Sequence, residues 1–222
     1  MEDFLIFINF KTYPQGTGQS AVKLAKACEE AGKESGFKII PVVQAVDLYR
    51  LTQEIQIPLW VQHVDWQPPG KHTGWTSLEA VVEAGAKGTL VNHSEHPIPL
   101  GTIKQILARV RDRVRVGKIN FDVMVCCKTL GQMERLARLR PNFIAYEVSE
   151  LIGSEVSIVK SHQKAVKHAV KICGRVPLVI GAGIHRAEDL KIARSLGAKG
   201  VLISSAVVEA KNPKEKLLSL LK

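Results

Sequence analysis

The feature that most constrains the fold is a strict alternation of short apolar segments with amphipathic segments along the whole chain. Eight runs rich in Val, Ile and Phe have the length of strands, and each is followed by apolar residues at helical spacing. We predict strands at 4–10, 37–43, 58–64, 88–92, 119–126, 143–148, 177–182 and 200–205. We predict helices at 20–35, 45–54, 77–86, 102–114, 130–139, 163–174, 186–198 and 213–221, of which the second has the weakest pattern.

This alternation predicts the α/β class, because strands that alternate with helices form a parallel sheet covered by those helices. The 222 residues give about 28 for each of eight units, close to the roughly 30 of a strand–helix–strand unit. Eight units favour a closed, single-domain (β/α)8 barrel over residues 1–222. A doubly wound open sheet is the alternative, but no GxGxxG loop follows a strand.

Composition limits the cellular setting. The chain is 45% hydrophobic, yet no apolar run approaches the ~20 residues that span a bilayer. The first residues, MEDFLIFINF, lack the basic region and cleavage site of a signal peptide, so we expect a cytoplasmic protein. The cysteines Cys28, Cys126, Cys127 and Cys173 form no CxxC pair, which favours free thiols over a zinc site.

The net charge of +10 limits the partners. Basic residues are spread along the predicted helices, which favours solvated helical faces. Positive potential that attracts a small anionic substrate is a second explanation. RNA binding is a third, but no nucleic-acid motif is present. We therefore expect neither nucleic-acid nor membrane partners.

Polar residues lie at the ends of several predicted strands, at the end of a barrel where chemistry is concentrated. They are Asn9 and Lys11 at the end of the first strand, Gln62 and His63 at the third, Asn92, His93 and Glu95 at the fourth, and Glu147 at the sixth. Asn9 and Lys11 are two residues apart, so alternation along a strand points them the same way. Small residues end the last two strands: Gly181, Ala182 and Gly183, then Ser204, Ser205 and Ala206. Such residues before a helix let backbone N–H groups approach an anion.

One rim would thus carry a lysine, a histidine, a carboxylate and an anion cradle. A carboxylate can abstract a proton from carbon next to a carbonyl if an electrophile stabilises the resulting enediolate. These groups fit proton transfer in a small phosphorylated carbonyl compound.

Four segments carry a resemblance to a known family. INFKTY, GKHTGWTSLEAVVEAGAKGTLVNHSEH, YEVSELIGS and VIGAGIHRAEDL resemble triosephosphate isomerases of the short archaeal type, in order, from residue 5 to about residue 214. The combination of NxK, HTG and NHSE along an eightfold barrel is far more specific than any one of them. The resemblance implies interconversion of dihydroxyacetone phosphate and D-glyceraldehyde 3-phosphate, without metal or organic cofactor.

The resemblance also implies roles for particular residues. Glu147 would be the general base and His93 the electrophile, with its ring kept neutral by N–H groups at the start of the following helix. Lys11 would supply positive charge and Asn9 would hydrogen-bond the carbonyl region. Glu95 would orient Lys11 or its own loop.

Further residues would bind phosphate or a second subunit. Gly153, in a lid at 148–158, would join Gly181, Gly183, Ser204, Ser205 and Ala206 at the phosphate. Thr73 and Gly74 would lie on a loop that enters a neighbouring subunit, which implies a homodimer or homotetramer.

Five residues, at four places in the chain, depart from the family pattern. Val148 replaces a proline after the base, Glu155 replaces a lid glycine, His185 and Arg186 stand where Ser or Thr is usual, and Ala206 replaces a glycine. All of them bear on the lid or the phosphate cradle. They predict weaker phosphate affinity or a slower lid, with the catalytic side chains intact.

The remaining histidines and tryptophans favour structural roles. His63 and His72 fit packing or hydrogen bonding. His96 lies three residues after His93, but no third ligand is evident, so we expect no metal site. Trp60, Trp66 and Trp75 fit core or subunit contacts better than base stacking.

Two other functions remain open from the sequence. A phosphosugar aldolase or epimerase could use the same barrel, and a Schiff-base aldolase would need Lys11 as its nucleophile. A catalytically weakened homologue could use the barrel as a binding or assembly module.

Overall fold

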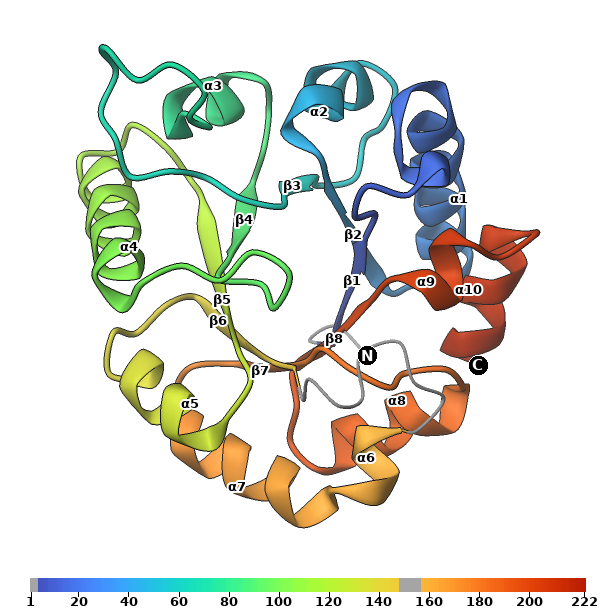
Figure 1. The fold of residues 1–222 in the computed structure, drawn as a ribbon. Coiled ribbons are helices and arrows are strands. Elements are labelled where there is room, and N and C mark those ends of the chain that lie inside the picture. Colours follow the sequence, from blue (N-terminus) through green and yellow to red (C-terminus); the bar gives the residue numbers. More distant parts are fainter. Residues whose placement is uncertain (1–3, 148–156) are drawn as a thin grey trace.

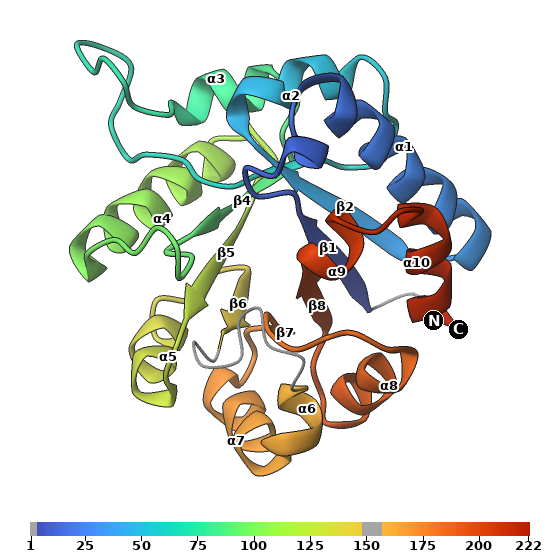
Figure 2. The same cartoon turned by 45° about the vertical axis from the view of Figure 1, so that its right-hand side comes forward.

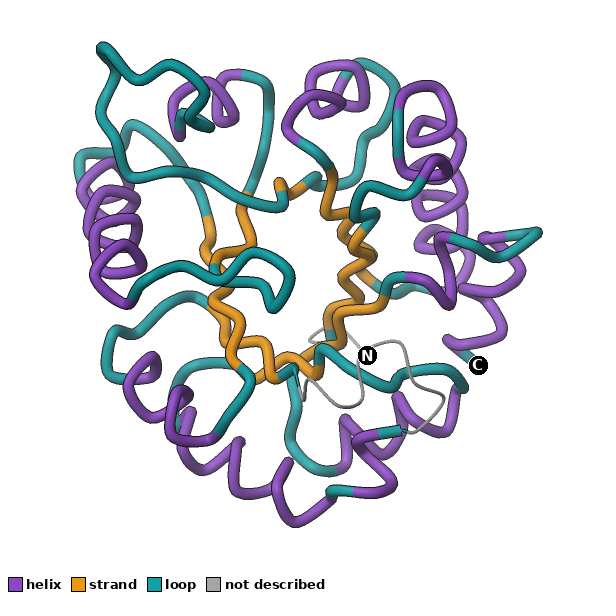
Figure 3. The backbone as a smooth tube through the Cα atoms, in the orientation of Figure 1, coloured by secondary structure: helices purple, strands orange, loops and turns teal. Residues whose placement is uncertain are grey.

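The computed structural model describes residues 4–147 and 157–222 (Figure 1). Eight parallel strands form a closed barrel, in which each strand pairs with the next and β8 returns to β1 (Figure 3). They are β1 Leu5–Asn9, β2 Lys38–Val43, β3 Trp60–Val61, β4 Gly88–Val91, β5 Asp122–Cys127, β6 Phe143–Tyr146, β7 Leu178–Ile180 and β8 Gly200–Ile203. The (β/α)8 prediction is confirmed, and the pairing of β8 with β1 excludes an open sheet.

Helices surround the barrel on its outer side (Figures 1 and 2). They are α1 Gly18–Ser35, α2 Ala45–Thr52, α3 Leu78–Glu83, α4 Leu100–Arg115, α5 Leu130–Ala137, α6 Ile158–Ser161, α7 Gln163–Cys173, α8 Ala187–Ser195, α9 Ser205–Val208 and α10 Pro213–Leu221. No helix in the described parts of the chain is long and apolar enough to cross a membrane. That residues 1–222 form one domain remains a prediction.

Three short elements were missed by the sequence pattern: α6, α9 and the 3-10 helix Pro14–Gly16. Each has four residues or fewer, too few to show a helical period.

The strand expected at 58–64 is reduced to Trp60–Val61. The backbone N–H of Gln62 still donates to Val43 O at 3.1 Å, as in a strand. The backbone N–H of Asp65 donates instead to Thr76 O. That pairing closes the neck of the loop formed by residues 66–75, so the chain leaves the barrel after Gln62.

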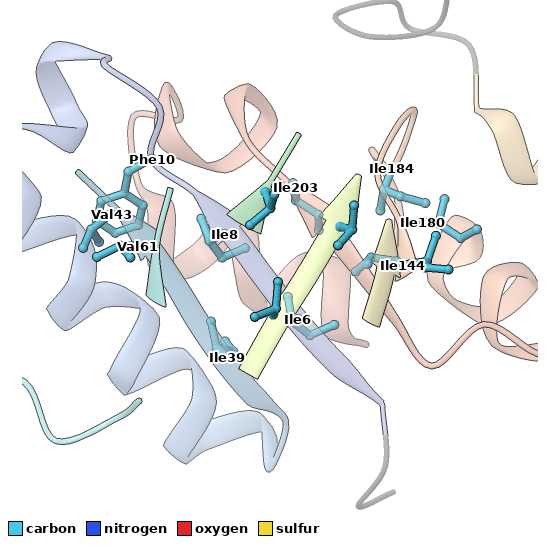
Figure 4. Close-up of a cluster of buried hydrophobic side chains, with 14 of the residues drawn as sticks. Ile6, Ile8, Phe10, Ile39, Val43, Val61, Ile144, Ile180, Ile184 and Ile203 are labelled. Atoms are coloured by element: carbon cyan, nitrogen blue, oxygen red, sulfur yellow. The ribbon is translucent and has the colours of Figure 1, made fainter. Parts of the chain in front are cut away.

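The core has two layers that follow from strand alternation. One side of the strands packs against the helices, as Figure 4 shows for Ile6, Ile8, Ile39 and Ile203. The other side fills the barrel with a separate set: Phe7, Ile40, Val42, Trp60, Leu90, Met124, Cys126, Ala145, Val179 and Leu202.

Aromatic rings lie within the inner layer. The ring of Phe7 lies edge-on to Trp60 at 4.9 Å and to Phe143 at 5.8 Å between centroids. Such edge-to-face contacts fix each ring's orientation as well as burying area. The barrel is therefore a packed core and not a channel.

All four cysteines are free and buried, as the sequence predicted. Burial raises the pKa of Cys28 and that of Cys173 to about 12. These thiols are therefore protonated at neutral pH and unreactive.

Gly88 gives a test of the inner layer. A Cβ at this position would lie 2.4 Å from Cε2 of Trp60, inside the ring's van der Waals surface. Gly88→Ala should lower the free energy of unfolding by about 1–3 kcal/mol, because the core must shift to admit the methyl group. Denaturant titration measures this loss.

Gly101→Ala is the matched control. Gly101 lies in α4, and a Cβ there would meet nothing within 4 Å. Its free energy of unfolding should stay the same or rise, since Ala favours a helix over Gly. Equal stabilities for the two variants would contradict the packing described for Trp60.

Candidate active site

Polar side chains from five strand ends gather at the carboxyl-terminal rim of the barrel. They line a cavity of about 100 Å³. Its lining comprises Asn9, Lys11, Tyr13, His93, Glu147, the turn 181–185 and residues 202–206. A second cavity of about 340 Å³ shares Asn9, Lys11 and His93 with the first, so the two adjoin at these residues. The closed barrel thus brings together residues that are far apart in the sequence.

Glu147 follows β6 and is 1% exposed. Its backbone amide donates to Cys127 O at 2.8 Å, which extends the sheet by one bond. Its Oε2 accepts the amide of Ser94 at 3.1 Å. Its Oε1 lies 3.0 Å from His93 Nε2, within ion-pair distance, but accepts no hydrogen bond among the described residues. A buried carboxylate oxygen therefore has lone pairs available at the cavity.

Cys126 adds to the charge environment of this carboxylate. Its side chain belongs to the layer inside the barrel. Burial, and then the neighbouring charge of Glu147, raises the pKa of the Cys126 thiol well above its usual range. The group next to the carboxylate is thus a neutral thiol.

His93 lies in a turn after β4 and not at the start of a helix. The turn is closed by the amide of His96, which donates to His93 O at 2.8 Å, and α4 begins only at Leu100. The expected contact with the helix N-terminus is therefore wrong. The ring instead receives a hydrogen bond from within the turn, where the backbone amide of Glu95 donates to His93 Nδ1 at 3.2 Å. A lone pair is then needed at Nδ1, which leaves the ring proton on Nε2, the atom nearest Glu147.

Asn92 shapes this turn, a role that the sequence pattern did not predict. Its backbone is left-handed, with φ of +62°, a conformation that Asn tolerates better than most residues. Its side-chain amide donates to Cys126 O at 2.8 Å, and its Oδ1 accepts the amide of Ile98 at 3.0 Å. One side chain therefore joins the buried end of β5 to the turn that follows β4.

Lys11 and Asn9 both line the cavity, but not through strand alternation. β1 ends at Asn9, and Lys11 has a left-handed backbone with φ of +47°. Asn9 Oδ1 accepts the amide of Lys11 at 3.0 Å, and Gln62 Nε2 donates to Lys11 O at 2.9 Å. Lys11 Nζ lies 2.5 Å from Glu95 Oε1. A hydrogen-bonded turn therefore aims the lysine at the rim.

Small residues form the opposite wall. Gly183 has φ of +64°, which a side chain would disfavour. Ser204 donates its hydroxyl to Asn9 O at 2.8 Å, tying the end of β8 to β1. Ser205 and Ala206 lie in α9. Ala206 has no positive φ, so its backbone does not require glycine.

The turn after β7 is held by Asp189, a residue that the sequence pattern did not assign to the site. Asp189, 2% exposed, accepts the amides of His185 and Arg186, both at 3.0 Å. Lys216 from α10 donates to His185 O at 3.0 Å. His185 lines the cavity, whereas Arg186 is exposed and does not. An acid in the first turn of a predicted helix was the available signal for Asp189.

Some expected site residues lie elsewhere. Thr73 and Gly74 are exposed on the loop 66–75, which projects at the upper left of Figure 1. Gly153, Val148 and Glu155 lie outside the described residues. Among the residues that are described, no group of three or more His, Cys, Asp or Glu side chains could hold a metal ion.

Comparison with known proteins agrees with this arrangement. The family model "Triosephosphate isomerase" matches residues 4–221. The triosephosphate isomerase of Methanothermus fervidus is 38% identical over 225 residues, covering 100% of this chain and 99% of that protein. Those of Methanocaldococcus jannaschii and Methanobrevibacter smithii are 37% and 36% identical, over 98% and 97% of this chain and 99% and 96% of theirs. With the barrel and the rim residues in place, the chain belongs to the triosephosphate isomerase family.

Proposed function

We propose that this chain interconverts dihydroxyacetone phosphate and D-glyceraldehyde 3-phosphate, with Glu147 as the base that moves the proton. The family and the full-length relatives support the activity, an isomerase step of glycolysis. The assignment of the base rests on the surroundings of one carboxylate oxygen. Oε1 of Glu147 is buried, accepts no hydrogen bond from the described residues, and lies 3.0 Å from His93 Nε2.

Glu147 suits proton transfer between two adjacent carbons. Burial removes water that would otherwise solvate the carboxylate. Ser94 holds only Oε2, so Oε1 is available to take a proton from one carbon and return it to the next.

His93 suits the role of the electrophile. Because the Glu95 amide occupies Nδ1, the Nε2–H donor faces the cavity and can polarise the substrate carbonyl. An enediolate intermediate bears charge on that oxygen, and a donor already in place stabilises it without reorganisation. Lys11 and Asn9 on the same wall would supply positive charge and a hydrogen bond, and Glu95 positions Lys11.

The phosphate would lie against the small residues Gly181, Gly183, Ser204, Ser205 and Ala206. Backbone N–H groups can approach an anion there because no large side chain intervenes. Of the altered residues in the described part, His185 and Ala206 border the cavity and Arg186 does not. Weaker phosphate affinity than is usual for the family remains a prediction, as does a role for Gly153.

A second copy of the chain would complete the site. The cavity of about 340 Å³ adjoins Lys11 and His93 and offers room for an inserted loop. The projecting loop carries Thr73, Gly74 and the half-exposed Trp75, and α2 exposes Val46 and Tyr49 at 82% and 65%. Large apolar side chains exposed on one chain favour burial against another. We therefore propose a homodimer or homotetramer, located in the cytoplasm.

The rival functions fit less well. A Schiff-base aldolase needs a lysine free in a desolvated pocket, whereas Lys11 is paired with Glu95. A non-catalytic module would leave the Glu147 and His93 arrangement without a purpose. An epimerase could use a base and an electrophile too, but the family match favours the isomerase.

Replacing the base tests the proposal directly. Glu147→Gln keeps the side-chain shape but removes the proton acceptor, so kcat for glyceraldehyde 3-phosphate should fall at least ~10²-fold with KM little changed. A coupled assay measures both constants. Full activity in this variant, or no turnover in well-folded wild type, would overturn the proposal.

Gly181→Ala tests whether the carboxylate must be placed accurately. A Cβ at Gly181 would lie 2.8 Å from Glu147 Cγ and 3.3 Å from Tyr146 O. The displaced carboxylate should lower kcat by about 10²-fold. Gly131→Ala, on α5 where a Cβ meets nothing within 4 Å, should keep wild-type kcat. Wild-type kcat in both would argue that Glu147 tolerates displacement.

A charge on the projecting loop tests the subunit contact. Trp75→Glu should lower the molar mass seen in sedimentation, because a carboxylate resists burial against a second chain. His168→Glu adds the same charge to an exposed position on α7, across the barrel from the loop (Figure 1). This control variant should keep the wild-type molar mass. A wild-type molar mass for Trp75→Glu, or a monomeric wild type, would refute the contact.

A further inference from the structure

Two histidines outside the proposed catalytic set meet beside the active site. The rings of His63, after β3, and His96, the last residue of the turn after β4, lie 4.6 Å apart between centroids at 44°. Both line the 340 Å³ cavity together with His93, Glu95 and Lys11. The contact therefore joins the end of one strand to the turn that carries the electrophile.

His63 is the fixed member of the pair. Its Nε2 lies 3.1 Å from Asp65 Oδ1, and both side chains are mostly buried, at 16% and 13% exposure. Asp65 Oδ2 accepts the amide of Thr76 at 2.7 Å, and the Asp65 amide donates to Thr76 O at 2.9 Å. The ring is thus oriented by a carboxylate that is itself held at the neck of the loop 66–75.

His96 is the exposed member, and its ring makes no hydrogen bond or ion pair with the rest of the described chain. Its amide closes the turn on His93 O at 2.8 Å. The same turn supplies the Glu95 amide to His93 Nδ1 and the Glu95 carboxylate to Lys11. A shift of His96 would therefore move the groups that aim both His93 and Lys11.

We propose that His96, resting on His63, is a positioning residue for the isomerisation, and that the contact holds only while at most one of the two rings is charged. This inference rests on the proposed roles of His93 and Lys11. The ring of His63 packs against the ring of His96 and so fixes the position of the turn that contains His96. Two imidazolium rings at this separation would repel each other.

The charges around the pair determine the direction of the pH effect. The facing groups are Asp65 from the β3 side and His93, Glu95 and Lys11 from the rim. Burial lowers the pKa of His63 below its usual value, Asp65 opposes that shift, and a charge on His96 adds to it. The unfolded chain therefore binds the His63 proton more readily than the folded chain. Stability from this site is complete above about pH 6.5 and is lost as the pH falls below that value.

Two substitutions at His96 separate the contact from the charge. His96→Ala removes the ring, and should lower kcat about 10-fold at pH 8 with KM within about twofold of wild type, because His93 and Lys11 lose their alignment. His96→Phe keeps a ring against His63 but cannot be protonated. It should keep kcat near wild type at pH 8 and lose less activity than wild type between pH 6.5 and 5.5.

His168→Phe is the control, since His168 is exposed on α7 and far from the site. Its pH profile should coincide with that of wild type, and the ionisation of the substrate phosphate is common to all variants. Wild-type kcat in His96→Ala, or a His96→Phe profile that overlies wild type, would overturn the proposal.

An NMR titration of the histidine ring protons gives a readout that does not depend on turnover. In His96→Phe the apparent pKa of His63 should rise, because the neighbouring positive charge is gone. An unchanged His63 titration would contradict the pairing even if the enzyme were fully active. If the wild type shows no isomerase activity but the pKa of His63 still rises in His96→Phe, the proposed function fails while the contact between the two rings stands.

Discussion

Closure of the barrel is the constraint on which the rest of the structure depends. β8 pairs with β1 in parallel register, from Leu5 opposite Gly200 to Ile8 opposite Ile203. Gly200 allows the closest approach at this seam, since a Cβ there would lie 2.5 Å from Leu5 O. Because all strands are parallel, closure places every carboxyl-terminal strand end on one rim. The base from β6, the electrophile from β4 and the lysine from β1 share a cavity for that reason.

Within the rim, hydrogen bonds from backbone amides orient most of the functional side chains. The Ser94 amide holds one oxygen of Glu147, the Glu95 amide sets the tautomer of His93, and the amides of His185 and Arg186 bind Asp189. Such donors are fixed by the fold and lose little entropy when they bind. Two left-handed residues, Lys11 and Asn92, give the turns their shape. Side-chain chemistry therefore rests on turn geometry, and the turn geometry rests on the strands.

The sequence was most informative where periodicity is long and least informative in short turns. Eight strands and the long helices could be predicted, because their burial repeats along the chain. Lys11 was expected at the rim by strand alternation, but a left-handed turn places it there. His93 was expected beside a helix, but a turn amide meets it instead. Asp189 and Asn92 were not predicted as site supports, since their partners are backbone groups that composition does not mark.

What the sequence determined by itself is the order of elements, the fold class and the residues available for chemistry at each strand end. Those follow from local patterns of apolar and polar residues and from the family motifs in NFK, NHSE and YE. Which atoms meet depends on the folded chain: Ser94 meets Glu147, Lys11 meets Glu95, and His63 meets His96. Each of these pairs joins different strand ends, and their separation in space is set by barrel closure and turn conformation. No local pattern encodes that separation, because it depends on all eight strands at once.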